Sequence, residues 1–315
     1  MRTAVLLCAL LSTAIVSPVL AQAAECTPFS GDAERVCTAA VDATRAFHPL
    51  LGGLVSGGNP VFGTGGPLGS PGRFAITPRV NAMEIVLPDL SYDGSSNTVP
   101  AGDKVFAPAP LIEAAVGLYG GLPSGLLAVD VLGSAQLLPT SVLDHFTVDN
   151  DARRIGDVAL GLGYGLRVGI LKETGPLPGV AVSVMRRDIP TITYGSIADG
   201  DEFQYSVDLH ATNLRLTVGK QLGVIGLAGG IGWDKYTGNG LIRVPTALQP
   251  ADFGFRLKTS RATAFLDAGL GLGVVTLNGE AGYQTGKDQD LTTDFEDFDT
   301  TKGKFYAGLG LRVGL

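Results

Sequence analysis

The strongest constraint in the sequence is a strict two-residue alternation, seen in VALGLGYGLRVGI, residues 158–170. Val158 and every second residue after it are large and apolar, whereas the positions between them hold alanine, glycine and Arg167. A membrane-spanning helix needs about 20 apolar residues, and each interior glycine costs a helix roughly 1 kcal/mol relative to alanine. The segment is therefore predicted to be a β-strand with one apolar face and one small or charged face.

Similar alternating segments recur from residue 72 onward, and the connections between them are short and long in turn. Up-and-down outer-membrane barrels have tight turns at one end and longer loops at the other, whereas a Greek-key sandwich does not sort its loops this way. We predict an all-β fold, an antiparallel up-and-down transmembrane β-barrel of about ten strands. The predicted strands are 72–88, 106–119, 125–138, 156–171, 178–192, 202–220, 223–237, 253–274, 278–285 and 303–315.

The first 23 residues, 1–23, have the features of a secretory signal peptide. Arg2 precedes an apolar run, and small residues around Ala21 and Ala23 suit a cleavage site. After export, Cys26 and Cys37 would remain as a pair in an oxidising compartment, where a local disulfide is the expected state. Two cysteines without a nearby histidine provide too few ligands for a metal site, so neither a metal nor another cofactor is predicted.

The mature chain divides into an N-terminal segment, 24–71, and a barrel domain, 72–315. A helix is predicted over 29–55, with Ser30 as its N-cap and apolar residues at helical spacing. This helix is either an ordinary amphipathic helix packed on a core or a plug that lies in or under the barrel lumen. The glycine- and proline-rich linker that follows it, 56–72, has no regular pattern.

The last segment, KFYAGLGLRVGL (304–315), alternates up to the final residue. Here the chain resembles Gram-negative outer-membrane β-barrel proteins, whose closing strand carries an alternating signal that the barrel-assembly machinery reads. The positions that fit this signal are Gly308, Leu311 and Val313. Over residues 30–315 the layout is also similar to a family of uncharacterised bacterial barrels with an N-terminal helix. The resemblance implies localisation in the outer membrane, contact with its lipid, and recognition of residues 304–315 by the assembly machinery.

Charge and hydropathy agree with a membrane barrel and argue against a nucleic-acid partner. The chain has 23 Lys and Arg residues against 30 Asp and Glu residues, a net charge of −7. Loss of Arg2 with the signal peptide would leave 22 − 30 = −8. An acidic protein is poorly suited to neutralise phosphates. The mean hydropathy of +0.27 is high for a chain without a continuous helical span, as expected when alternation hides the apolar residues.

The strand face opposite the apolar one carries charges of both signs, which we expect to line the lumen. Such side chains usually pair in salt-bridge networks inside small barrels. A closed polar core and a narrow or gated polar channel both remain possible, and no ring of one sign predicts ion selectivity. The predicted lumen-facing residues are Arg79, Glu113, Asp130, Asp157, Arg167, Arg186, Asp188, Asp208, His210, Asp267, Glu280 and Arg312.

The sequence contains no strong catalytic motif, and we predict that the chain is not an enzyme. DLHATN (208–213) is similar to the His-x-Ser-Asn arrangement of outer-membrane phospholipases, with threonine in place of serine. In those enzymes the pair faces the lipid. Here Val207, Leu209 and Ala211 are interpreted as the lipid face, which puts His210 in the lumen. The acidic loop 287–302 lacks the order of an EF-hand and is expected to be a solvated loop.

Three classes of function remain open. The preferred prediction is a passive channel or transporter for small compounds, hydrophobic ones included, with the N-terminal helix as a hatch, as in long-chain fatty-acid channels. The first alternative is a structural or surface-interaction barrel with a sealed lumen. The second alternative is an outer-membrane lipid hydrolase at His210. No feature of the sequence identifies a solute.

Overall fold

Ten long strands form a closed antiparallel barrel in the computed structural model, which describes residues 23–139, 146–246 and 250–314. The predicted signal peptide lies outside these residues except for Ala23. Pairing of the last strand with the first closes the barrel. The ten strands are β1 (Phe74–Pro88), β3 (Ala101–Tyr119), β4 (Val129–Pro139), β7 (Val158–Leu171), β8 (Gly179–Tyr194), β9 (Gln204–Leu222), β10 (Ile225–Val244), β11 (Ala251–Leu272), β12 (Val275–Gln284) and β14 (Lys304–Gly314).

The remaining elements are short strands in the long loops and three helices. The short strands are β2 (Thr98–Val99), β5 (Phe146–Val148), β6 (Arg154–Ile155) and β13 (Asp294–Phe295), and the helices are η1 (Ala24–Cys26), α1 (Asp32–Ser56) and η2 (Ile197–Asp199). Within the described ranges, no helix has both the length and the hydropathy of a membrane span. The predicted all-β fold with an N-terminal helix is confirmed.

β3 and β10 extend furthest beyond their predicted ranges, and the reason is pairing beyond the apolar part. β3 begins at Ala101 because it pairs with β1 as far as Ala101↔Pro88. β10 continues to Val244, which pairs with Ala251 of β11. In both extensions the outward residues are largely polar, so the apolar alternation on which the prediction relied is lost there. Backbone hydrogen bonds do not require that alternation.

The outer surface carries an apolar belt. Outward side chains from all around the barrel are large, apolar and exposed, among them Leu266, Phe305 and Leu309 at 72%, 75% and 68%. Towards the long-loop end the outward positions become charged, as at Lys104 of β3 and Lys235 of β10. A broad exposed apolar band with a charged margin is the surface of a barrel that spans a lipid bilayer. In β7 the predicted apolar face points outward and Arg167 is buried inside.

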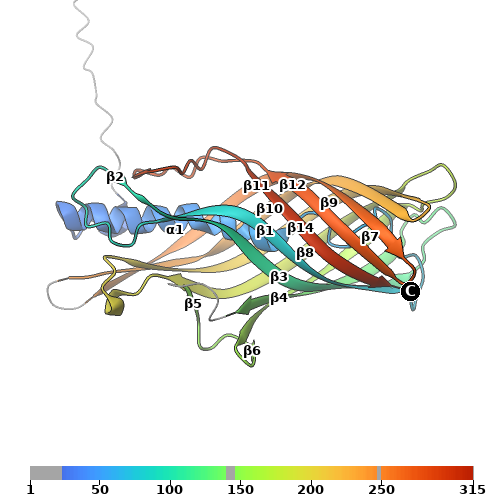
Figure 1. Cartoon of the computed structure of the whole chain (residues 1–315), viewed down its shortest axis with the longest axis horizontal. Helices are drawn as coiled ribbons and strands as arrows, with labels where there is room; N and C mark the ends of the chain where they lie inside the picture. The colour runs from blue at the N-terminus through green and yellow to red at the C-terminus, as the bar shows by residue number, and fades with distance from the viewer. Residues whose placement is uncertain (1–22, 140–145, 247–249, 315) are drawn as a thin grey trace, which may run out of the picture.

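α1 lies inside the barrel along its axis, with its N-terminal end at the long-loop end (Figure 1). Of the two interpretations of this helix, the structure shows the plug. Its buried residues share one core cluster with inward side chains such as Met83, Tyr205 and Leu209. The helix starts at Asp32 rather than residue 29, and its N-cap is Gly31, at φ 66°, without a side-chain hydrogen bond. Ser30 therefore does not cap it, because the backbone turns into the helix one residue later.

α1 approaches the wall closely at one glycine. A Cβ atom at Gly52 would lie 2.7 Å from ring atoms of Tyr236, which is fully buried. Real Cβ atoms do not come this near to other heavy atoms. Only glycine lets the helix backbone pack directly on the tyrosine ring, so this position sets how deeply α1 sits against β10.

We expect Gly52→Leu to destabilise the folded protein by about 1–3 kcal/mol, because the new side chain overpacks the contact with Tyr236. Denaturant unfolding followed by Trp233 fluorescence measures the change. Gly254→Leu is the matched control, since the nearest atom to a Cβ there is 3.8 Å away. Equal midpoints for the two variants would contradict the close packing of α1 on the wall.

Candidate functional site

The lumen has two differently filled parts, and the first is a polar layer around the end of α1. The guanidinium of Arg215 donates from Nε to the carbonyl of Gly58 (3.0 Å) and from Nη2 to that of Gly57 (2.8 Å). Its Nη1 forms an ion pair with Asp234 at 2.6 Å. A helix C-terminus carries carbonyl groups without intrahelical partners. Arg215 satisfies carbonyls just past the end of α1 and fixes them to the wall.

The same layer fixes the linker that follows α1. Glu280 accepts hydrogen bonds from the backbone N–H groups of Gly58 (2.9 Å) and Asn59 (2.7 Å). The Asn59 amide donates to Asp267 (2.7 Å), and Arg79 donates to the Asn59 carbonyl (3.1 Å). Because linker groups bond to three different parts of the wall, this stretch is threaded through the lumen rather than lying loosely in it.

Ion pairs fill the rest of the polar layer. Glu113 lies between Arg79 (3.2 Å) and Arg187 (2.7 Å). Arg167 pairs with Asp130 at 2.8 Å, and all of these side chains are almost fully buried. Each of these charges has a partner of opposite sign, which offsets the cost of burying it. Seven of the predicted lumen residues are in this layer, namely Arg79, Glu113, Asp130, Arg167, Asp267, Glu280 and Arg312.

Five predicted lumen residues are not in the lumen. In β9 the buried inward positions are Val207, Leu209 and Ala211. The prediction of which face of this strand points into the lumen is therefore wrong. The reason is that at this level the lumen holds the apolar surface of α1 instead of water, so the apolar face turns inward. Asp157 is exposed just before β7. The other four lie on the outer face of β8 and β9: Arg186, Asp188, Asp208 and His210.

Several buried residues of the polar layer were not predicted, Asp234 among them. Arg187 follows Arg186 and points inward, while Asn213 and Arg215 occupy the inward positions of β9. The sequence contains a signal that Asn213 and Arg215 point inward. Leu214, Leu216 and Val218 alternate with Asn213, Arg215 and Thr217, and this run gives the correct direction of the strand.

The second part of the lumen is an apolar cavity between α1 and the wall, towards the long-loop end. Its volume is about 290 Å³. The fifteen residues that line it are all apolar: Phe47, Leu51, Leu54, Val55, Val80, Ile85, Ala107, Pro108, Ala109, Pro110, Leu137, Leu138, Phe146, Val148 and Ile192. A concave apolar space flanked by a helix and several strands is the usual form of a site for a small hydrophobic ligand.

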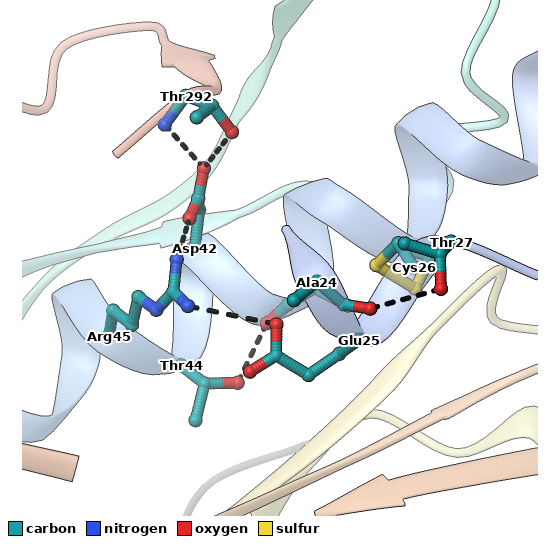
Figure 2. Close-up of a disulfide and its surroundings, with 10 residues drawn as sticks. Ala24, Glu25, Cys26, Thr27, Asp42, Thr44, Arg45 and Thr292 are labelled. Carbon is teal, nitrogen blue, oxygen red and sulfur yellow. Dashed lines mark hydrogen bonds and ion pairs between the residues drawn. A yellow bond between two sulfur atoms is a disulfide. The ribbon is translucent and has the colours of Figure 1, made fainter. Parts of the chain in front are cut away.

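Above the cavity, the N-terminal half of α1 is tied to the acidic loop between β12 and β14 (Figure 2). The buried carboxylate of Asp42 accepts from the backbone N–H groups of Thr292 and Thr293, each at 2.8 Å, and from the Thr292 hydroxyl at 3.0 Å. Arg45 contacts the same carboxylate at 3.2 Å. The loop was predicted to be solvated, but part of it covers α1. It is held there because its N–H and hydroxyl groups donate hydrogen bonds to Asp42.

Other contacts anchor the same end of α1. The predicted disulfide is present between Cys26 and Cys37 and joins the segment before the helix to its second turn.

In the acidic loop between β12 and β14, hydrogen bonds from the side chain and backbone of Thr301 lower the pKa of Asp299. Among the described residues, no group of three or more His, Cys, Asp or Glu side chains is placed to hold a metal ion.

On the outer face of the barrel, His210 forms a pair with Asp188. The imidazole Nδ1 lies 2.6 Å from a carboxylate oxygen of Asp188, and both side chains are about two-fifths exposed. Arg186 contacts the same oxygen at 3.1 Å. Thr237 lies opposite His210 in the register of β10. The pair therefore faces outward, near the margin of the apolar belt, instead of into the lumen.

Neither a protein-family model nor a characterised protein sequence matches the chain. Solved structures that resemble it include the outer-membrane protease OmpT of Escherichia coli, with 10% identity, coverage of 78% of this chain and 97% of the other, and a TM-score of 0.40. Another is the translocator domain of the autotransporter NalP from Neisseria meningitidis, with 12% identity, 88% and 96% coverage and a TM-score of 0.38. OccK9 (OpdG) of Pseudomonas aeruginosa has 9% identity, 77% and 98% coverage and a TM-score of 0.20.

This chain is a membrane-spanning β-barrel. Its closed antiparallel wall and apolar belt carry that statement. The prediction that it is not an enzyme is withdrawn, because outer-membrane barrels include a protease, OmpT. An absence of activity does not follow from the barrel fold. Recognition of residues 304–315 by the assembly machinery stays a prediction.

The polar layer gives a testable difference in stability. We expect Asp234→Ala to cost about 3–5 kcal/mol, because it leaves the buried charge of Arg215 without its partner. Asp252→Ala, which removes an ion pair with Arg243 whose side chains are both 43% exposed, should cost less than about 1 kcal/mol. Chemical denaturation of both variants measures this. Similar losses would show that the layer does not hold the plug.

Proposed function

We propose that the protein transports small, uncharged apolar compounds and that the cavity beside α1 is its binding site. The observation that carries this proposal is the cavity itself, which lies within a membrane barrel and is lined by hydrocarbon side chains alone. The size supports a small ligand. An apolar protein cavity of about 150 Å³ binds benzene. At about 290 Å³, this one suits a molecule with two fused rings or a short alkyl chain.

The lining also selects by charge. Not one of its fifteen residues offers a side-chain hydrogen-bond donor or a cation. Moving an ionised group into such a space without a partner is strongly unfavourable, so a free carboxylate or phosphate is excluded from it. The ligand class is therefore neutral hydrocarbons and their weakly polar derivatives, rather than ionised fatty acids or phospholipids.

Below the cavity, the path along the barrel axis is filled. The linker groups of Gly58 and Asn59 are bonded to Arg215 and Glu280 on the wall, and Glu113 joins Arg79 to Arg187 across the same region. These contacts support a carrier of individual ligands instead of an open water-filled pore. Ordinary porins keep an aqueous channel through the whole barrel.

Ala109→Trp tests the site, because Ala109 lines the cavity and a tryptophan there would occupy it. We expect binding of radiolabelled naphthalene by the purified protein to fall roughly tenfold or more. Ala114→Trp is the control, since Ala114 lies on the same strand, opposite Gly133, and does not line the cavity. Naphthalene binding that is equal in both variants, or absent from the wild type, contradicts the proposed function.

A second candidate function, hydrolysis of a lipid ester, is favoured by one observation, the outward pair of His210 and Asp188. A histidine oriented by a carboxylate is the base of many hydrolases, and it needs a nucleophile within hydrogen-bond reach. Thr237 lies opposite His210, and its hydroxyl donates to the backbone carbonyl of His210 at 3.5 Å. We expect His210→Ala to abolish any phospholipid hydrolysis by the purified protein, with Asp157→Ala as control. Activity that survives His210→Ala contradicts this candidate.

A further inference from the structure

We infer that the cavity exchanges its ligand sideways with the lipid of the membrane, through a gap in the wall between β3 and β4. This inference rests on the proposed function and adds the route that the ligand takes. Four observations carry it: the end of a backbone ladder, the placement of two prolines, the composition of the cavity lining, and the position of the gap in the apolar belt.

The ladder between β3 and β4 stops halfway along β3. The two strands pair from Tyr119↔Val129 to Leu111↔Gln136. β3 continues through residues 101–110, and there it pairs with β1 on its other edge only, as in Val80↔Pro110. β4 continues beyond Gln136 and pairs with β7, as in Leu137↔Leu160. Along this part of the wall, the described strands β3 and β4 are not joined by backbone pairing, and Figure 1 shows β6, which pairs with β7, protruding outside the wall.

Two prolines keep this edge of β3 from pairing. The carbonyl of Pro110 accepts a hydrogen bond from the side-chain amide of Gln136 on β4, at 2.8 Å. The backbone polar groups of Pro110 therefore face β4, and those of Pro108, two residues away, face the same way. Proline has no N–H group to donate. At both positions the edge that faces the gap lacks a donor, so β4 cannot extend its ladder along β3 there.

The cavity lining passes through the wall at this point. Ala107 and Ala109 are buried and point inward towards the leucines of α1. Pro108 is exposed on the outer face, yet it lines the same cavity. Val80 of β1, 42% exposed on the outer face, also lines it. A space bounded by both inward and outward residues of one strand reaches around that strand's free edge.

The gap lies within the apolar belt. Its neighbours on the outer face of β3 are Phe106 and Ile112, which are exposed at 63% and 41%. Lys104 follows at the charged margin towards the long-loop end. The opening therefore faces the outer part of the hydrocarbon region. A neutral apolar ligand that moves through it stays in apolar surroundings throughout, and no step requires its transfer into water.

The experiment uses the full-length protein in phospholipid vesicles that contain 3-trifluoromethyl-3-phenyldiazirine, a small neutral photolabel that dissolves in the bilayer. After illumination, mass spectrometry measures labelling of the α1 peptide that contains Leu51 and Leu54. Labelling of the lipid-facing peptide around Leu266 normalises the values. In the wild-type protein we expect the α1 peptide to be labelled from the lipid, although α1 lies inside the barrel.

Two independent variants close the gap. Pro108→Val with Pro110→Val restores two N–H donors to the edge of β3, and Leu137→Trp fills the opening without changing the backbone. We expect both to reduce labelling of α1 severalfold. Pro78→Val is the matched control, because Pro78 lies in β1 opposite Ile112, where β3 is paired with both of its neighbouring strands, and should leave labelling unchanged. If one closing variant does not fold, the other still decides the outcome.

The failure of this inference can be told apart from the failure of the proposed function. If wild-type α1 is not labelled from the bilayer, or if the closing variants are labelled like the control, the lateral route is wrong. If wild-type protein nevertheless binds naphthalene added from water, the proposed function stands and another route supplies the cavity. Absence of naphthalene binding to the wild type would overturn both proposals.

Discussion

The structure depends on the need to fill the interior of a ten-stranded barrel. A lumen of this size is too wide for the wall's own side chains alone in a chain so rich in glycine and alanine, and α1 supplies the missing volume. The helix and the wall fit each other because glycine stands where they touch most closely, at Gly52 against Tyr236. Burial of the plug and closure of the barrel are therefore parts of one packing problem.

The interior is divided by chemistry along the barrel axis. Around the end of α1, Arg215 and Glu280 of the wall bind backbone groups of the linker, and Glu113 pairs with Arg187. Along the middle of α1, the wall presents apolar side chains such as Leu209 and Ile192, and no charge is needed there. The polar layer holds the plug in place. The apolar part leaves space, and that space is the candidate site.

Much of this fold could be predicted from residue patterns, because lipid outside a barrel imposes a strict period of two. The alternation in residues 158–170 and the lengths of the connections were sufficient for the barrel. The direction of β9 was assigned wrongly, because Val207, Leu209 and Ala211 are as apolar as a lipid face, and a plug helix and lipid are chemically alike. The gap was also beyond prediction, since it depends on where β4 leaves β3.

The direction of α1 has a topological consequence. Its N-terminal end lies among the long loops, whereas β1 begins at the opposite end of the barrel, so the linker runs through the lumen between them (Figure 1). Once β14 pairs with β1, the strands form a closed ring around the helix. Assembly must therefore either close the cylinder around a helix already in position or draw the leading segment through a finished ring. In the first case the N-terminal segment takes its final position before β14 pairs with β1. In the second case β14 pairs with β1 first.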